Sequence, residues 1–256
     1  MSQIFVFVDD TSMSSLPEVA LQMAASLSKT YSKQICLLAI SESDSDFESK
    51  SSLLSKLNAE CVASDFRVLK KDEDFTEFME QTEASMLLFQ VEDKRSQVMS
   101  YLKLCRGLRI PYFFCRAEHK VAFSNILVPV TFLIEDREKG PFASSFGRFF
   151  SARVTLLKPK DYGSRAQQTI DAIDVLLEKA GVVHDIMQGS KDSFKVEREA
   201  SEVALSKGYD LVICSASREY GIDDIVFGPR ELKTIRKSSV PVMLINPRSD
   251  LYTLCG

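Results

Sequence analysis

Two successive series of alternating strand and helix patterns constrain the fold of this chain more than any other feature. In the first series, short apolar runs typical of buried strands are separated by segments whose apolar residues recur at helical spacing. The expected strands are residues 4–8, 35–40, 66–69, 86–89 and 112–115. Because consecutive strand–helix–strand units cross over with a right-handed twist, this order predicts a doubly wound, mainly parallel sheet.

The pattern restarts after a polar stretch at residues 116–123, which we interpret as a linker. The second set of expected strands is 125–130, 154–157, 182–187, 211–214 and 240–245. The sequence therefore predicts an α/β protein of two tandem domains, residues 1–118 and 124–248, each a doubly wound sheet of five mainly parallel strands.

Three local expectations concern the helices. Leu16, Val19, Ala20, Met23 and Leu27 predict a helix over residues 14–29. The Ser/Asp/Glu-rich residues 41–52 are expected to form an exposed loop that leads into a helix. Gly228-Pro229 is expected to open the last helix, with Pro229 at its first helical position, where a missing N–H costs nothing.

Composition excludes several classes of protein. The chain of 256 residues has 45% apolar and 27% charged residues and a formal net charge of −4, so a nucleic-acid partner is not expected. No apolar run is long enough to span a bilayer, and the first residues lack the basic region of a signal peptide. We therefore expect a cytoplasmic protein that has no membrane partner.

Metal binding and hydrolase chemistry are not expected either. The six cysteines form no C-x-x-C pair, and His119 and His184, the two histidines, lie far apart in the sequence. There is no G-x-S-x-G motif for a serine nucleophile. The phenylalanines at 142, 146, 149 and 150 are expected to lie in the core or at an interface, since no basic stripe accompanies them.

Residues 209–247 contain the most informative motifs. They run Y-D-L-V-I-C, then a polar loop, then F-G-P-R-E-L-K-T-I-R-K-S-S-V-P-V-M-L-I, while the second series of strands opens with N-I-L-V-P-V. These segments resemble the universal stress protein family in its tandem, two-domain form. The resemblance implies two domains that pack about a pseudo-twofold axis with their fifth strands adjacent, which would bring residues 111–115 near residues 241–245.

Nucleotide-binding members of that family carry G-x-x-G, nine further residues, and G-S or G-T after the fourth strand. In the second half of this chain those places are Ser215, Arg218, Gly228 and Pro229, so the spacing is kept and most of the chemistry is lost. Arg218 has a side chain where glycine would let the backbone approach phosphate, and Pro229 offers neither an N–H nor a hydroxyl. The family's aspartate after the first strand is replaced by Thr131.

The first half departs differently. Asp9 matches the aspartate after the first strand, but residues 89–97, F-Q-V-E-D-K-R-S-Q, contain no glycine. Each half therefore lacks a different part of the site. The resemblance implies a vestigial nucleotide cleft, whose candidate residues are Asp9, Val130, Thr131, Ser215, Arg218, Gly228, Pro229 and Arg230.

Asp9 and Asp10 would also suit the acidic, Mg²⁺-holding pair of a phospho-receiver domain. Such a domain needs an acceptor aspartate after its third strand, where this chain has Lys70 and Lys71, and a Lys-Pro pair after its fifth. An acidic strand-to-helix loop is the simpler interpretation.

These observations favour a non-catalytic stress-response or regulatory protein that acts through protein partners or a weakly held small ligand. No catalytic residue, metal or cofactor is expected, and homodimer formation is left open. The alternative is a universal stress protein that binds ATP and hydrolyses it slowly, or phosphorylates itself, with Arg218 and Arg230 in place of loop amides. A third hypothesis, a pure scaffold, predicts no cavity of ligand size beside Thr131 and Ser215.

Overall fold

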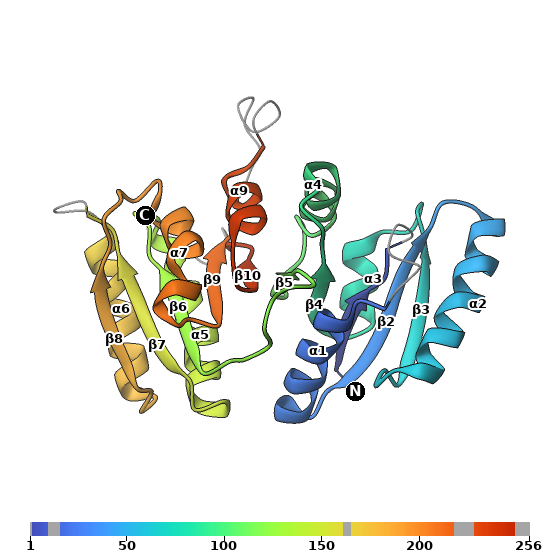
Figure 1. Cartoon of the computed structure of the whole chain (residues 1–256), viewed down its shortest axis with the longest axis horizontal. Helices are drawn as coiled ribbons and strands as arrows, with labels where there is room; N and C mark the ends of the chain where they lie inside the picture. Colours follow the sequence, from blue (N-terminus) through green and yellow to red (C-terminus); the bar gives the residue numbers. More distant parts are fainter. Residues whose placement is uncertain (1, 10–15, 161–164, 218–227, 249–256) are drawn as a thin grey trace.

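The computed structural model describes residues 2–9, 16–160, 165–217 and 228–248. Within them, the chain folds into one mixed α/β structure around a single ten-stranded sheet (Figure 1). The strand order is β3-β2-β1-β4-β5-β10-β9-β6-β7-β8. The expected α/β fold with a mainly parallel sheet is confirmed, and the ten strands form one continuous sheet where we had expected two separate ones.

The strands of the first half all run parallel, and most of their residues are buried. They are β1 (Gln3–Phe7), β2 (Gln34–Ser41), β3 (Asp65–Lys70), β4 (Ala84–Gln90) and β5 (Tyr112–Cys115). β1 lies between β2 and β4, so the direction of winding reverses there. Open α/β sheets bind ligands beyond the carboxyl ends of the strands at such a reversal.

The second half repeats the order of the first. Its strands are β6 (Asn125–Pro129), β7 (Arg153–Lys158), β8 (His184–Gln188), β9 (Leu211–Ser215) and β10 (Val242–Ile245). Here β6 lies between β7 and β9, which creates a second switch point.

The two halves meet where β5 pairs with β10, the antiparallel pair of the sheet. Phe113 lies opposite Met243 in this pair, and both are fully buried or nearly so. Beside it, the Tyr112 hydroxyl donates to Asn246 Oδ1 at 2.8 Å, and the Asn246 amide donates to the carbonyl oxygen of Cys105 at 2.6 Å. The domain limits at 118 and 124 stay a prediction, but the sheet and its core run across them.

Helices cover both faces of the sheet, and the two faces have separate apolar cores. One face is covered by α1 (Glu18–Tyr31), α2 (Asp44–Glu60), α5 (Lys139–Phe149) and α6 (Arg165–Lys179). The other is covered by α3 (Phe75–Gln81), α4 (Arg95–Leu104), α7 (Val196–Val203) and α9 (Arg230–Lys237). Two short 3₁₀ helices, η2 (Ile134–Glu138) and η3 (Leu205–Lys207), precede α5 and follow α7.

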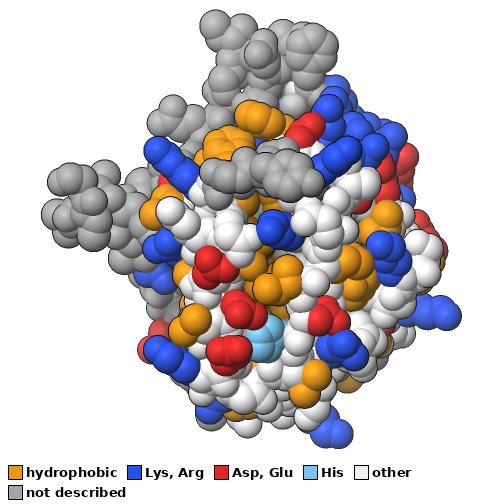
Figure 2. All heavy atoms as spheres, turned by 90° about the vertical axis from the view of Figure 1, so that its left-hand side faces the viewer, with side chains coloured by type: hydrophobic (Ala, Val, Ile, Leu, Met, Phe, Trp, Pro, Cys, Tyr) orange, Lys and Arg blue, Asp and Glu red, His pale blue; other side chains and the backbone are white. Residues whose placement is uncertain are grey.

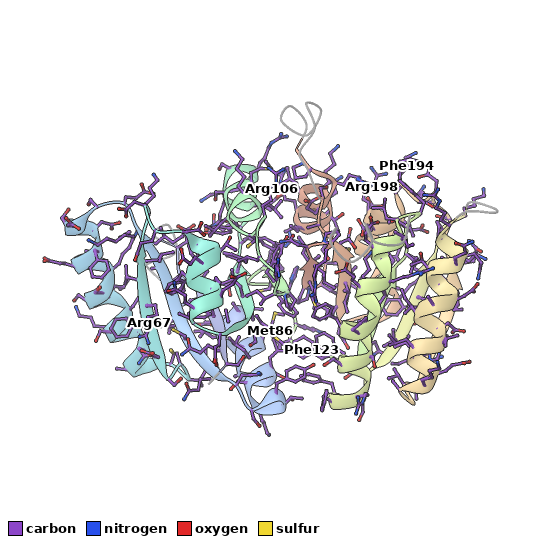
Figure 3. All side chains as sticks on the ribbon, turned by 180° about the vertical axis from the view of Figure 1, so that it is seen from behind. Arg67, Met86, Arg106, Phe123, Phe194 and Arg198 are labelled. Carbon is purple, nitrogen blue, oxygen red and sulfur yellow. The ribbon has the colours of Figure 1, made fainter. Side chains whose placement is uncertain are left out.

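Aromatic side chains close the junction of the halves on the α1–α5 face. Phe123 lies at this junction (Figure 3), with its ring centroid 5.3 Å from that of Phe146. Tyr31 of α1 meets the rings of Phe149 and Phe150, and its hydroxyl lies 2.8 Å from Ser145 Oγ. The expectation that these phenylalanines serve the core or an interface is confirmed for Phe146 and Phe150.

The end of the molecule formed by β8 and α6 has a mixed surface. Apolar, acidic and basic side chains are interspersed on it (Figure 2), and Val175, Val183 and Ile186 are exposed there. No single sign of charge dominates this face in the described part of the chain.

Three local expectations need correction. α1 begins at Glu18, so residues 16 and 17 of the expected helix lie outside it, and residues 14 and 15 lie outside the described part. α2 already begins at Asp44, within the stretch expected to be a loop, because the Ser43 hydroxyl caps it by accepting from the backbone N–H of Asp46. Pro229 is the N-cap of α9, one position before the first helical residue.

Candidate functional site

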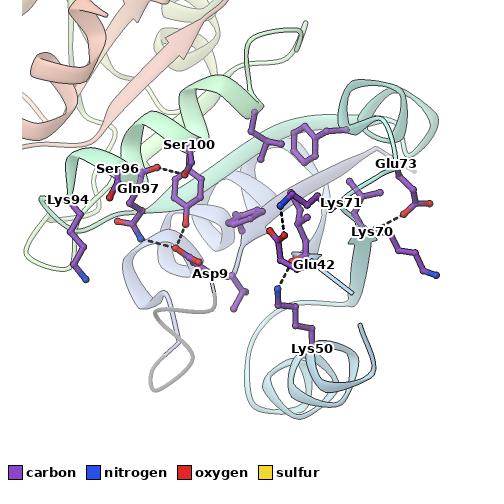
Figure 4. Close-up of a pocket in the computed structure, with 17 residues that line it drawn as sticks. Asp9, Glu42, Lys50, Lys70, Lys71, Glu73, Lys94, Ser96, Gln97 and Ser100 are labelled. Carbon is purple, nitrogen blue, oxygen red and sulfur yellow. Dashed lines mark hydrogen bonds and ion pairs between the residues drawn. The ribbon is translucent and has the colours of Figure 1, made fainter. Parts of the chain in front are cut away.

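We compare one cleft from each half, each at the carboxyl ends of parallel strands. The larger, which we call the N-terminal cleft, has a volume of about 620 Å³. It lies among the ends of β1, β2 and β3 and the start of α4 (Figure 4). Its size falls within the roughly 300–1,000 Å³ range of small-molecule sites.

Apolar and aromatic side chains form the inner wall of the N-terminal cleft. Phe7, Phe75 and Tyr101 contribute the rings, together with Val8, Ile40, Leu69 and Leu104. The Phe7 and Tyr101 rings meet edge to face with centroids 5.1 Å apart, and Tyr101 stacks on Phe89 at 4.6 Å. Such packing holds the Phe7 and Tyr101 rings in place.

Asp9 stands at the end of β1 and is oriented by α4. Its Oδ2 accepts hydrogen bonds from Gln97 Nε2 at 3.0 Å and from the Tyr101 hydroxyl. Gln97 in turn accepts from the backbone N–H of Glu92 at 2.9 Å, so its side chain occupies one of the amides of the β4–α4 loop. The sequence predicted that the β4–α4 loop lacks the glycines of a phosphate loop. In the structure, the Gln97 side chain also binds one of the backbone amides of this loop.

Lysines surround the mouth of the N-terminal cleft. Lys50, Lys70, Lys71 and Lys94 all line it, alongside the carboxylates of Glu42 and Glu73. Lys50 is 4% exposed, and its ammonium group donates to the carbonyl oxygen of Ile40. These lysines were not among the predicted site residues.

The smaller cavity, the C-terminal cleft, has a volume of about 250 Å³ and lies beside Thr131 and Ser215. It is lined by Thr131, Leu133, Asp136, Glu197, Ser215, Ala216, Ser217, Arg230, Glu231 and Pro247. The scaffold hypothesis predicted no cavity of ligand size there, and this volume is below the range of small-molecule sites.

A buried lysine fills the switch point of the second half. Lys139, at the start of α5, has no exposed surface and places its ammonium group 3.1 Å from Asp136 and 2.9 Å from Glu197. The same group donates to the carbonyl oxygen of Pro129, near the end of β6, at 2.8 Å. Burial lowers the pKa of Lys139, but Asp136 and Glu197 more than offset this and hold its pKa above the usual value.

The two carboxylates that hold Lys139 also satisfy the polar groups around them. Asp136 accepts from the backbone N–H of Thr131 at 2.5 Å and from the Ser215 hydroxyl at 2.7 Å. Glu197 accepts from the backbone N–H of Ser215 at 3.1 Å. The ends of β6 and β9 are thus bound internally, at the place where a nucleotide would need them free.

A third carboxylate adds negative charge to the C-terminal cleft. Glu231, in the first turn of α9, is 2% exposed and accepts from the Ser217 N–H at 3.0 Å and the Ser217 hydroxyl at 2.7 Å. Burial raises its pKa. Asp136, Glu197 and Glu231 thus face one guanidinium, that of Arg230, and the Lys139 ammonium group that pairs with the first two, so the cleft offers phosphate little net attraction.

The predicted site residues separate into two groups. Asp9 lines the N-terminal cleft, whereas Thr131, Ser215 and Arg230 line the C-terminal cleft. Val130 is buried in the core, Gly228 and Pro229 precede α9, and Arg218 lies outside the described residues.

Gly228 has a structural role in the described surroundings. Its φ of +79° lies in the left-handed region, and a Cβ at this position would collide with the Leu232 side chain. The glycine is therefore required by the turn into α9, whether or not a phosphate binds.

Sequence analysis missed the residues that form the interior of both clefts. Gln97 and Tyr101 are four residues apart on α4, a spacing that places them on the face toward Asp9, and this was a usable signal. Asp136, Lys139 and Glu197 have no comparable motif. In the described residues, no group of His, Cys, Asp and Glu is arranged to hold a metal ion, and no helix is long and apolar enough to cross a membrane.

Comparison with known proteins confirms the fold. No protein-family model and no curated protein sequence matches the chain. Among solved structures, a universal stress protein from Archaeoglobus fulgidus DSM 4304 superposes with a TM-score of 0.67 over 97% of each chain, at 12% identity. A protein of unknown function from Pseudomonas aeruginosa PAO1 has a TM-score of 0.61 at 14% identity, covering 96% of this chain and 92% of that one.

The cytoplasmic domain of a prokaryotic cation chloride cotransporter is also similar, with a TM-score of 0.56 at 13% identity, covering 96% of this chain and 95% of that one. These structural similarities define a fold class. The chain has the fold of the universal stress proteins over nearly its whole length, as the sequence motifs predicted.

Proposed function

We propose that this chain is a non-catalytic regulatory protein of the universal stress protein fold, which responds to a small ligand in its N-terminal cleft. The observation that carries the proposal is the contrast between the two switch points. One opens into a cleft of about 620 Å³, and the other is filled by the Lys139 ammonium group and its carboxylates.

The C-terminal half serves, in this proposal, as a structural partner of the first. Its polar groups bind each other, so a triphosphate would have to displace the buried Lys139–Asp136 and Lys139–Glu197 pairs. Breaking such pairs costs several kcal/mol, about 3–5 for the loss of one partner.

A regulatory role through protein contacts is supported by one of the similar structures. The similar cytoplasmic domain belongs to a cation chloride cotransporter, so the fold also works as part of a larger protein. A protein partner, a homodimer and a cytoplasmic location stay predictions.

ATP binding is the second candidate, and Asp9 favours it. Asp9 follows β1 by two residues, at the place of the aspartate that nucleotide-binding universal stress proteins use, and it lines the open cleft. Hydrolysis or autophosphorylation through Arg218 and Arg230 has less support, because Arg230 lies in the other cleft, beside Glu231.

The test is to block the N-terminal cleft without touching the core. Ser100 is an exposed residue of α4 that lines the cleft, so Ser100→Trp places a large ring at its mouth. Ser52→Trp, at an exposed position of α2 that does not line it, is the matched control. We expect mass spectrometry to find a small molecule copurified with the wild type and with Ser52→Trp, and lost from Ser100→Trp.

Turnover of ATP separates the two candidates. We expect release of phosphate from ATP with Mg²⁺ at the background rate for all three proteins. ATP hydrolysis that Ser100→Trp abolishes would support the second candidate, and a ligand retained by Ser100→Trp would show that the site is elsewhere.

A further inference from the structure

The four lysines that line the N-terminal cleft suggest an anion-binding site, but each of them forms an ion pair with a carboxylate. Lys70 lies 2.8 Å from Asp44, Lys50 lies 2.9 Å from Asp46, and Lys94 lies 2.6 Å from Glu92. Lys71 pairs with Glu42. Each of these four ammonium groups therefore has a carboxylate beside it that offsets its charge.

The remaining charges of the cleft are negative. Among the described lining residues and their ion-pair partners there are six carboxylates and four ammonium groups. Two of these carboxylates are Asp9, which Gln97 and Tyr101 bind, and Glu73, which accepts from the Lys70 N–H. A hydrogen bond from Lys70 lowers the pKa of Asp44, and one from Lys50 lowers that of Asp46. Both carboxylates are thus ionised at neutral pH, and the mouth offers no net attraction to a phosphate group.

One backbone amide of the loop between β4 and α4 is already occupied. The Gln97 side chain binds the N–H of Glu92, and residues 91–94 include no glycine that would let the backbone fold around an anion. Phosphate sites of α/β proteins depend on such amides.

What the cleft does offer is a set of rings and neutral polar groups. The rings of Phe7, Phe75 and Tyr101 line it, each at most 9% exposed. The hydroxyls of Ser96 and Ser100 lie along α4 (Figure 4), beside Gln97, whose amide already binds Asp9 and the Glu92 N–H. A few neutral polar groups beside an apolar wall are what orients an uncharged aromatic ligand.

We propose that the N-terminal cleft binds an uncharged, planar aromatic compound and discriminates against the phosphorylated form of the same compound. This inference rests on the proposed function, since it names the ligand class of that site. It differs from nucleotide binding because phosphate groups weaken the interaction.

The first test compares ligands that differ only in phosphate. Binding of adenosine, AMP and ATP, and of riboflavin and its monophosphate, is measured by calorimetry with wild type and Ser100→Trp. We expect at least one uncharged member to bind, its monophosphate to bind about tenfold or more weakly, and Ser100→Trp to abolish binding. A tenfold change corresponds to about 1.4 kcal/mol.

Two results would overturn the inference, and they are distinguishable. If affinity at this cleft rises with each phosphate, the ligand class is wrong while the proposed function stands. If no member of either series binds in a way that Ser100→Trp abolishes, the inference fails; if, in addition, no copurified molecule is lost from that variant, the proposed function fails as well.

The second test removes two of the carboxylates that pair with the lysines of the cleft. Asp44 and Glu92 are exposed partners of Lys70 and Lys94, so the double variant Asp44→Asn/Glu92→Gln releases two ammonium groups at the mouth. We expect affinity for the phosphorylated compounds to rise by about fivefold, while affinity for the uncharged ones stays the same.

The matched control is Glu48→Gln/Glu178→Gln, which removes two exposed carboxylates of α2 and α6 that do not line the cleft. It changes the net charge equally and should leave the phosphate preference unaltered. Equal effects of the two double variants would show that overall charge, and not the local pairing, sets the preference, which contradicts the inference.

Discussion

Lys139 is the residue that most changes the interpretation of the second half. Its ammonium group lies between Asp136 and Glu197 at the point where the strand order reverses. A buried ion pair of this kind adds little net stability relative to apolar packing, but removal of one partner leaves a buried charge without compensation.

Lys139→Ala is therefore expected to lower the free energy of unfolding by about 3–5 kcal/mol. Lys179→Ala, at an exposed position in the last turn of α6, is the control and should change it by less than about 0.5 kcal/mol. Urea unfolding followed by circular dichroism measures both. A loss below about 1 kcal/mol for Lys139→Ala would show that the network relaxes and that the ammonium group is not essential there.

At the scale of elements, α9 is anchored at both ends. Glu231 in its first turn binds Ser217, and Arg116, from the segment that joins the two halves, binds the carbonyl groups at its carboxyl end. The Arg116 guanidinium donates to the carbonyl oxygens of Ser238 and Arg236, and Arg236 in turn reaches Asp93 at 2.6 Å. The last helix of the second half is thus attached to the first half through side chains.

His119 completes this cap only in its neutral form. The backbone N–H of Arg116 donates to Nδ1 at 3.2 Å, which requires Nδ1 without a hydrogen, and Nε2 lies 3.2 Å from the Ser238 carbonyl oxygen and 3.3 Å from Arg116 Nε. Burial and the neighbouring Arg116 lower the pKa of His119 to about 4.

The sign of the pH dependence follows from that pKa. Between about pH 6.5 and pH 4 the unfolded chain takes up a proton at His119 and the folded chain does not, so stability is lost as the pH falls through this range. We expect wild type to lose roughly 3 kcal/mol more than His119→Gln between pH 7 and pH 4. Urea unfolding at a series of pH values measures this, and parallel curves for the two proteins would contradict it.

At the scale of the whole molecule, the antiparallel pairing of β5 with β10 makes one sheet from two similar halves. Both strands are fully buried. If the halves were separated, each would expose an apolar edge strand, which is a site for association with other chains.

We therefore expect residues 1–118 alone to aggregate or dimerise, and coexpression with residues 119–256 to yield a one-to-one complex. Analytical ultracentrifugation of the fragment and of the coexpressed pair measures this. A fragment that stays monomeric and folded would show that the first half is independent and that the predicted limits near 118 mark a self-sufficient domain.

Much of this architecture could be predicted because local pattern encodes it. The fifth strand was expected at residues 112–115, where it lies, since four consecutive apolar residues after a proline leave little choice. α2 was missed at its start, because its first turns are mostly Ser, Asp and Glu residues with Phe47 as the one apolar side chain before Leu53, and the Ser43 cap marks its beginning.

The sequence by itself determined the α/β class, the order of strands and helices, and the loss of the phosphate-loop chemistry, since these depend on neighbouring residues. Only the tertiary structure decided which switch point is open. The groups that decide it lie far apart in the chain: Tyr101 is 92 residues from Asp9, and Ser215 is 79 residues from Asp136. A parallel sheet brings the carboxyl ends of distant strands together, and which side chains meet there is not encoded in any single stretch.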